Sequence, residues 1–224
     1  SSQGRFDKVQ RKEDLIDKYE SKLGAYLIRL TKRELTTSQS RQVSLYLSTI
    51  SDFERIGDHA SYIAHISREM QEKRTAFSEE ARDELNVVME AVREIMNVTA
   101  GAFMEENHDE GKKVAPIGMV ITRLCDELKH NHVERLGTGM CELEQGTMFT
   151  DILNSFTRIA AHCASIMSAM SKTEEKSADI HIHNSRVYAG EGKEYYSYFD
   201  EYSRKYDLGT AGSHIQSMEP EEVV

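Results

Sequence analysis

The sequence predicts an all-α protein built from antiparallel helices with short connections. Three observations support this fold class. Apolar residues recur at steps of three and four over long stretches, which is the pattern of amphipathic helices. Only two prolines occur among 224 residues. No stretch alternates between apolar and polar residues strongly enough to indicate a sheet.

The apolar pattern divides the chain into five long helices. Ser78 precedes Glu79 and Glu80 as a helix N-cap with an acidic first turn, and Pro116 suits the first turn of a later helix. In the first helix, one apolar stripe comprises Leu15, Tyr19, Leu23, Tyr26, Leu27 and Leu30. The five helices are expected at about residues 9–35, 41–73, 79–106, 113–136 and 148–171.

The last fifty residues have a different character. Residues 177–187 show no helical period and are expected to form an extended connector. A short final helix is expected over about residues 194–206, anchored by aromatic side chains. The end of the chain, residues 209–224, has the composition of a disordered tail.

Charge and composition exclude several classes of partner. The formal net charge is −10, which disfavours binding to nucleic acid and direct docking on an anionic membrane. No apolar run approaches the roughly 20 residues that span a bilayer, so we expect no direct membrane insertion. Three scattered cysteines without a Cys-x-x-Cys pair indicate reduced thiols in a cytosolic compartment.

One helical motif occurs twice in the chain. Phe53, Arg55, Ile56 and His59 recur 103 residues later, whereas Glu54 and Asp58 do not. The repeated residues are Phe156, Arg158, Ile159 and His162, and the two carboxylates are replaced by Thr157 and Ala161. A duplication with this spacing predicts two three-helix bundles, with the first helix of the first bundle missing from this chain.

These residues resemble a known family. The segment 53–60, Phe-Glu-Arg-Ile-Gly-Asp-His-Ala, resembles the signature helix of the PhoU domain, and 12–17 resembles the helix before it. Segments of the second repeat are also similar to PhoU: Val120-Ile121 with Leu124, residues 132–136 and residues 151–154. The segment 198–208 resembles the end of the PhoU-like domain on sodium/phosphate cotransporters. The resemblance covers about residues 8–208.

The resemblance implies a domain organisation. Residues 8–76 would form a partial first PhoU-like repeat, 77–172 the second repeat, and 173–208 a connector with the C-terminal helix. Residues 1–7 would be disordered or vector-derived, and 209–224 disordered.

The resemblance also implies a non-catalytic regulatory domain linked to phosphate transport. It would be the C-terminal part of a sodium/phosphate cotransporter, at the cytoplasmic face of the cell membrane. Its partner would be the membrane transporter domain of the same polypeptide, with self-association into a homodimer as a further expectation. The alternative is a freestanding PhoU-type adaptor in phosphate signalling.

Four carboxylates form the candidate metal site. Glu54 and Asp58 are one helical turn apart on one face, and Glu13 and Asp17 repeat this spacing on the preceding helix. Converging carboxylates repel one another unless a cation neutralises them. The PhoU resemblance implies a cluster of iron, zinc, manganese or magnesium there. Acidic pairs at this spacing are also common on solvated helix faces, so a site without metal stays open.

The equivalent positions of the second repeat offer no carboxylate. They are Gly118, Thr122, Thr157 and Ala161, and we expect no multinuclear metal cluster there.

The repeated basic residues have a structural and a functional interpretation. Arg55 and Arg158 are expected to form interhelical salt bridges, the alternative being an anion as partner. His59 and His162 are expected to be hydrogen-bonded core histidines beside the helix seam, with His59 as a further candidate metal ligand.

Two other patterns carry less weight. His181 and His183 have a metal-ligand spacing only on a strand. Glu127 and His130, like Glu105 and His108, have the spacing found in di-iron oxidases, but the two pairs lie about 22 Å apart along antiparallel helices. An oxidase is therefore the third and weakest hypothesis.

Overall fold

The computed structural model describes residues 2–139, 143–174 and 180–209 of the chain. These ranges contain helices and no strand, so the all-α prediction is confirmed. The helices are α1 (Ser2–Leu30), α2 (Thr37–Glu72), α3 (Glu79–Met104), α4 (His108–Gly111), α5 (Val114–Gly137), α6 (Leu143–Glu174) and α7 (Ile180–Lys205).

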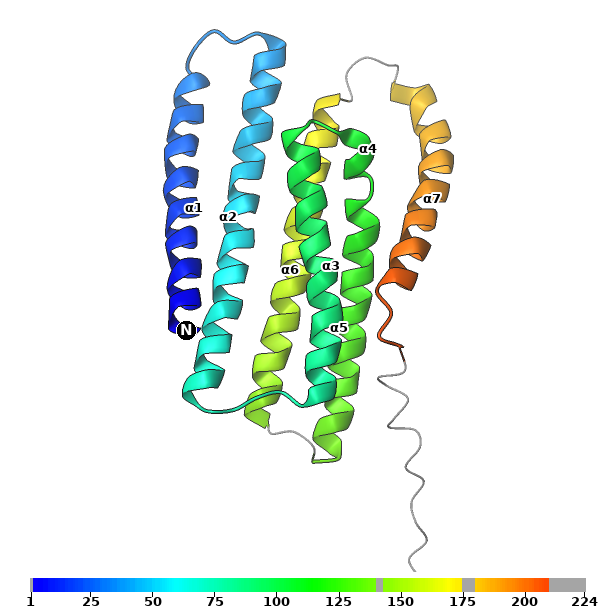
Figure 1. The fold of residues 1–224 in the computed structure, drawn as a ribbon. Coiled ribbons are helices and arrows are strands. Elements are labelled where there is room, and N and C mark those ends of the chain that lie inside the picture. Colours follow the sequence, from blue (N-terminus) through cyan, green and yellow to red (C-terminus); the bar gives the residue numbers. More distant parts are fainter. Residues whose placement is uncertain (1, 140–142, 175–179, 210–224) are drawn as a thin grey trace, which may run out of the picture.

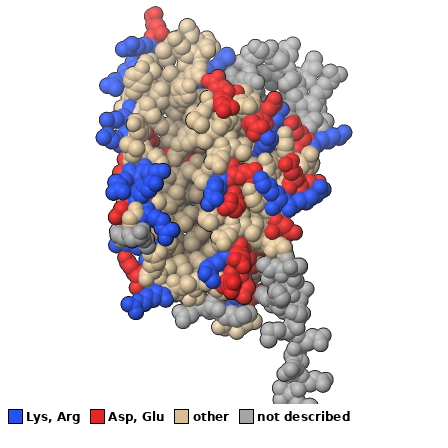
Figure 2. All heavy atoms as spheres, viewed as in Figure 1, with Lys and Arg blue, Asp and Glu red and all other residues tan. Residues whose placement is uncertain are grey.

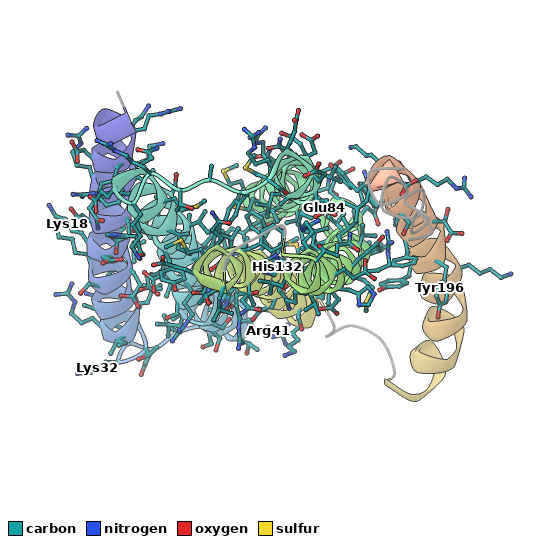
Figure 3. All side chains as sticks on the ribbon, turned by 90° about the horizontal axis from the view of Figure 1, so that it is seen from below. Lys18, Lys32, Arg41, Glu84, His132 and Tyr196 are labelled. Atoms are coloured by element: carbon teal, nitrogen blue, oxygen red, sulfur yellow. The ribbon has the colours of Figure 1, made fainter. Side chains whose placement is uncertain are left out.

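The helices form two units that meet along one line of contact (Figure 1). α1 and α2 make an antiparallel hairpin, and α3, α5 and α6 make a three-helix bundle. α2 runs antiparallel to α6 and packs along it, which joins the hairpin to the bundle. α7 covers the outer side of α5, so that α1 and α7 lie at opposite ends of the molecule when it is viewed along the helices (Figure 3).

The core lies mainly in the three-helix bundle. Ile95, Ile117 and Phe149, from α3, α5 and α6, are fully buried there. Tyr202 of α7 and Tyr206, which directly follows α7, are also buried, and the Nζ of Lys205 lies 2.8 Å from Glu94 on α3. The predicted aromatic anchoring of the last helix is therefore confirmed at these two tyrosines.

The expected core stripe of α1 is largely exposed. Leu15 is 49% exposed, Tyr19 58% and Tyr26 53%, whereas Leu27 is buried. Among the described helices α1 packs chiefly on α2, so only one of its faces is covered. The spacing of apolar residues in the sequence predicted an apolar face on this helix, but it does not specify whether another helix covers that face.

Several helix boundaries differ from the sequence prediction. α1 begins at Ser2, so the expectation of a disordered start is wrong for residues 2–7. The reason is tertiary: the Phe6 ring packs edge-on against His65, and the Arg68 guanidinium lies 4.8 Å from its centroid.

At the other end α7 begins at Ile180, so the extended connector is wrong from that residue on. Residues 175–179 and the tail 210–224 lie outside the described residues. The predicted N-cap at Ser78 is confirmed, because its side chain accepts a hydrogen bond from the Ala81 amide at 3.2 Å.

One face of the molecule is hollowed between α2 and α3. A cavity of about 340 Å³ lies near the N-terminal turn of α2, and its lining includes Arg41, Phe103 and Met170. A second cavity, of about 400 Å³, lies near the start of α3, and its lining includes Ile152 and Phe156 of α6. Figure 2 shows the uncharged surface between the two units on this side. Within the described ranges, no helix combines the length and the apolar character required to cross a bilayer.

Candidate functional site

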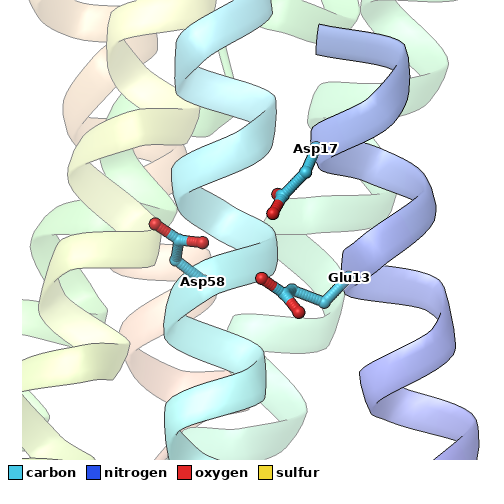
Figure 4. A group of neighbouring side chains, drawn as sticks. All are labelled: Glu13, Asp17 and Asp58. Atoms are coloured by element: carbon cyan, nitrogen blue, oxygen red, sulfur yellow. The ribbon is translucent and has the colours of Figure 1, made fainter. Parts of the chain in front are cut away.

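Antiparallel packing of α1 on α2 brings the predicted carboxylates together. Glu13 and Asp17 lie one turn apart on α1 and face Asp58 on α2 (Figure 4). One carboxylate oxygen from each of these three residues lies within 4.8 Å of the other two. The two helices of the first hairpin thus supply one cluster, as the repeated i,i+4 spacing predicted.

Glu54 belongs electrostatically to the same cluster. Partial burial raises its pKa, and the negative charge of Asp58 and a hydrogen bond to it add to the increase. Asp17 across the helix pair raises the pKa of Glu54 further, whereas Arg55 lowers it. Glu54 lies outside the close trio but shares its charge, so the four carboxylates are called the acidic cluster below.

The pKa of Glu13 shows the same repulsion from the other helix. Burial raises this pKa most, followed by the charges of Asp17 and Asp14. Asp58 on α2 also raises it. Because folding brings like charges together here, protons or a cation bind more tightly to the folded chain than to isolated carboxylates.

Small residues on α2 allow the close approach of α1. A Cβ atom at Gly57 would lie 3.1 Å from Cδ1 of Ile16, which is tighter than ordinary contact. The next turn carries Ser61, which is buried. Gly57 therefore leaves room for the neighbouring helix α1.

The donor set of the acidic cluster fits a hard divalent cation. All four side chains offer oxygen, which magnesium, manganese and iron accept, and zinc also takes carboxylate ligands. Asp17 and Asp58 are exposed, so water can complete the coordination shell of an ion. A bound cation would neutralise the repulsion that raises the pKa of Glu13 and Glu54.

The corresponding place in the second repeat is chemically different. The hydroxyls of Thr122 and Thr157 donate to backbone carbonyls of their own helices, at 3.0 and 3.1 Å. A Cβ at Gly118 would contact Ile95 at 3.6 Å, so this position lies against α3. The absence of a multinuclear cluster there stays a prediction, supported by the lack of any carboxylate at these positions.

The repeated histidines lie at the contact between α2 and α6, called the seam below. His59 and His162 are stacked, with ring centroids 5.9 Å apart. Nδ1 of His162 lies 2.8 Å from an oxygen of Asp52, and Ser165 donates to the other oxygen at 2.9 Å. The prediction of a hydrogen-bonded histidine beside the seam is therefore confirmed for His162. Burial lowers the pKa of His59, and the charge of His162 lowers it further.

The salt bridges predicted for the repeated arginines are wrong. Arg55 and Arg158 are both exposed. Neither forms an ion pair with an acidic residue in the part of the chain that the structure describes. The nearby carboxylates are engaged elsewhere, with Asp52 bonded to His162 and Asp151 accepting a hydrogen bond from Tyr62 at 3.1 Å.

The weaker motifs are not assembled into sites. Glu127 lies 3.5 Å from Arg123, and His130 lies 3.5 Å from Glu134, so both make local contacts on α5. His181 and His183 fall within the helix α7 and not on a strand. The strand geometry that a metal would need at these two histidines is therefore not present.

Sequence reasoning missed one buried polar group. Glu84 follows Glu80 at the i,i+4 spacing that is common on solvated helix faces, but its side chain is only 2% exposed. It forms a 2.8 Å ion pair with Arg135 and accepts a hydrogen bond from Asn131 at 2.7 Å. Figure 3 places Glu84 among the helices of the second bundle. The sequence signal for this pair was the i,i+4 spacing of Asn131 and Arg135 on α5.

Comparison with known proteins supports the family resemblance. Residues 2–67 match the family model described as the PhoU domain, a range that contains all four residues of the acidic cluster. The resemblance to PhoU is confirmed. The range begins at residue 2, as α1 does, and ends within α2.

Solved PhoU structures have the same fold. PhoU from Pseudomonas aeruginosa is 20% identical, with a TM-score of 0.72 over 78% of this chain and 83% of that one. The phosphate transport system regulatory protein PhoU from Streptococcus pneumoniae is 19% identical, with a TM-score of 0.64 over 78% and 82% of the two chains. At these identities the likeness establishes the fold alone. A comparison with curated proteins gave no match.

Proposed function

We propose that this chain is a non-catalytic regulatory domain for phosphate transport, acting at the cytoplasmic face of the cell membrane. The observation that carries this proposal is the PhoU domain match over the α1–α2 hairpin. The PhoU fold, shared with a protein described as a phosphate transport system regulatory protein, adds support.

The regulated partner in this proposal is a sodium/phosphate cotransporter domain in the same polypeptide. The test compares phosphate uptake by cells that express the intact gene with uptake by cells whose gene lacks residues 8–208. Uptake that no longer responds to external phosphate after the deletion supports a regulatory role. Unaltered uptake and unaltered response overturn it.

A fractionation experiment separates the attached domain from the freestanding adaptor. An antibody against this chain is used on membrane and soluble fractions of the native host. A band in the membrane fraction well above 25.6 kDa supports attachment to a transporter. A band in the soluble fraction near that mass overturns attachment and supports the adaptor.

The acidic cluster is proposed to bind a divalent cation as part of this function. The support is the approach of Glu13, Asp17 and Asp58 within 4.8 Å, together with the raised pKa of Glu13 and Glu54. When bound, the cation would supply positive charge that holds α1 against α2. Through this link metal occupancy would stabilise the hairpin, because a ligand that binds only the folded state shifts the unfolding equilibrium.

Thermal unfolding with and without metal tests this proposal directly. Manganese or iron added to the chelator-treated chain is expected to raise its Tm, and an Asp58→Asn variant is expected to lose that increase. A Thr157→Ala variant, at the equivalent position of Glu54 in the second repeat, serves as the matched control. An equal increase in all three proteins would show non-specific binding and overturn the assignment.

A further inference from the structure

The two repeated arginines lie at the same level of the seam. α2 and α6 are antiparallel, and the contact between Tyr62 and Asp151 fixes their register. Arg55 lies seven residues before Tyr62 and Arg158 seven residues after Asp151. Seven residues are about two helical turns, or roughly 10.5 Å, so both arginines are displaced equally and lie on the same side as this contact.

The contact between Asp52 and His162 gives the same register from the other side. Arg55 follows Asp52 by three residues, and Arg158 precedes His162 by four. These steps of about 4.5 and 6 Å lead in the same direction because the helices are antiparallel. Both guanidinium groups are also close enough to His59 to lower its pKa. The seam therefore carries two like charges at one level, beside a pair of stacked imidazoles.

Neither arginine has a protein counter-charge in direct contact. Within the described ranges no carboxylate lies within ion-pair distance of either guanidinium. Asp52 is occupied by His162 and Ser165, and Asp151 by Tyr62. Asp58 and Glu54 belong to the acidic cluster with α1; Arg55 is near enough to Glu54 to lower its pKa but forms no ion pair with it.

We propose that the seam binds a small tetrahedral oxyanion between Arg55 and Arg158. An oxyanion would neutralise both charges and accept paired N–H bonds from each planar guanidinium. The imidazole of His59 can add one further N–H donor. This inference rests on the geometry of the seam and not on the proposed role in phosphate transport.

The internal repeat gives independent support. The second copy lost both carboxylates of the metal motif but kept the arginine and the histidine at matching positions. Phe156 and Ile159, also kept, are buried and serve the core. Arg158 is exposed, so neither core packing nor a salt bridge accounts for it. A site that needs one arginine from each repeat accounts for both copies.

Isothermal titration calorimetry with the full chain tests the oxyanion site. The probes are inorganic phosphate and sulfate at pH 7.5, with ionic strength held constant by sodium chloride. Each of Arg55→Gln and Arg158→Gln is expected to weaken binding about tenfold or more, since each removes a charge-assisted bidentate contact. Arg158→Lys keeps the positive charge but loses the paired N–H donors of the guanidinium, so it is expected to give an intermediate loss of affinity. Arg33→Gln, at an exposed position after α1, is the matched control.

Stability in phosphate-free buffer provides a second readout. Removing one of two facing like charges relieves repulsion, so neither single variant is expected to have a lower Tm than the parent without anion. Phosphate is expected to raise the Tm of the parent and of Arg33→Gln, but not that of the Arg55→Gln/Arg158→Gln double variant.

Two results would overturn the proposal. One is equal phosphate binding by the parent and the double variant, which means that the anion binds elsewhere. The other is no saturable binding of either oxyanion by the parent, which means that the arginines serve a protein partner or solvent. Either result leaves the transport experiments above unaffected.

Discussion

The buried ion pair between Glu84 and Arg135 allows a quantitative test of the second bundle. Their side chains are 2% and 4% exposed, and 2.8 Å separates the paired atoms. In a Glu84→Ala variant the Arg135 guanidinium stays buried without its paired carboxylate, 5.6 Å from the centroid of the Phe149 ring. Breaking one partner of such a pair costs about 3–5 kcal/mol. That is a large part of the roughly 5–15 kcal/mol by which domains of this kind are stable.

Urea unfolding followed by circular dichroism measures this cost. Glu90→Ala is the matched control, because Glu90 pairs with Arg93 at the surface, where both side chains are more than half exposed. An exposed pair contributes about 0–1 kcal/mol. A double variant, Glu84→Leu with Arg135→Met, should recover most of the loss, since apolar replacement of both partners is often neutral or stabilising. If Glu84→Ala costs no more than Glu90→Ala, the burial of this pair is refuted.

Three further predictions follow from close contacts and shifted pKa values. Gly146→Ala should destabilise the chain by about 1–3 kcal/mol, because its Cβ would clash with the imidazole of His132 on α5. Gly24→Ala, where the space is open, should stabilise it by up to about 1 kcal/mol in the same urea assay. In metal-free buffer the acidic cluster should destabilise the fold as pH rises above about 4.5. The reason is that folding raises the pKa of Glu13 and Glu54, so the folded state binds more protons than the unfolded state. Asp58→Asn should flatten this dependence of Tm on pH, and an unchanged slope would contradict the clustering. Burial raises the pKa of Cys125 and Cys163 to about 11. In a Cys141→Ser background, neither thiol should therefore react with iodoacetamide at pH 7.5 until urea unfolds the chain. Rapid labelling of the native protein would show that these two cysteines are not buried.

The helices and the acidic cluster could be predicted because local spacing determines them. Steps of three and four marked the apolar faces, and the i,i+4 spacing of Glu13 with Asp17 and of Glu54 with Asp58 placed each pair on one face. Antiparallel packing of consecutive helices then brought the two pairs together.

The features that sequence reasoning missed depend on contacts between distant residues. The first turn of α1 is held by Phe6 against side chains on α2, about 60 residues away. Glu84 has the same local pattern as a solvated glutamate, and its contacts with Arg135 and Asn131 on α5 make its burial tolerable. Exposure of the α1 stripe depends on which neighbours are present, and the apolar period does not specify them.

The central claim is that one repeat carries a functional acidic metal site. Elemental analysis of the purified chain, after loading with iron, manganese, zinc or magnesium and desalting, tests it most directly. The comparison is between the parent, the Glu54→Ala/Asp58→Ala double variant, and Thr157→Ala as the second-repeat control. We predict bound metal in the parent and the control, and none in the double variant. Equal metal content in all three proteins, or none in the parent after loading, would contradict the claim.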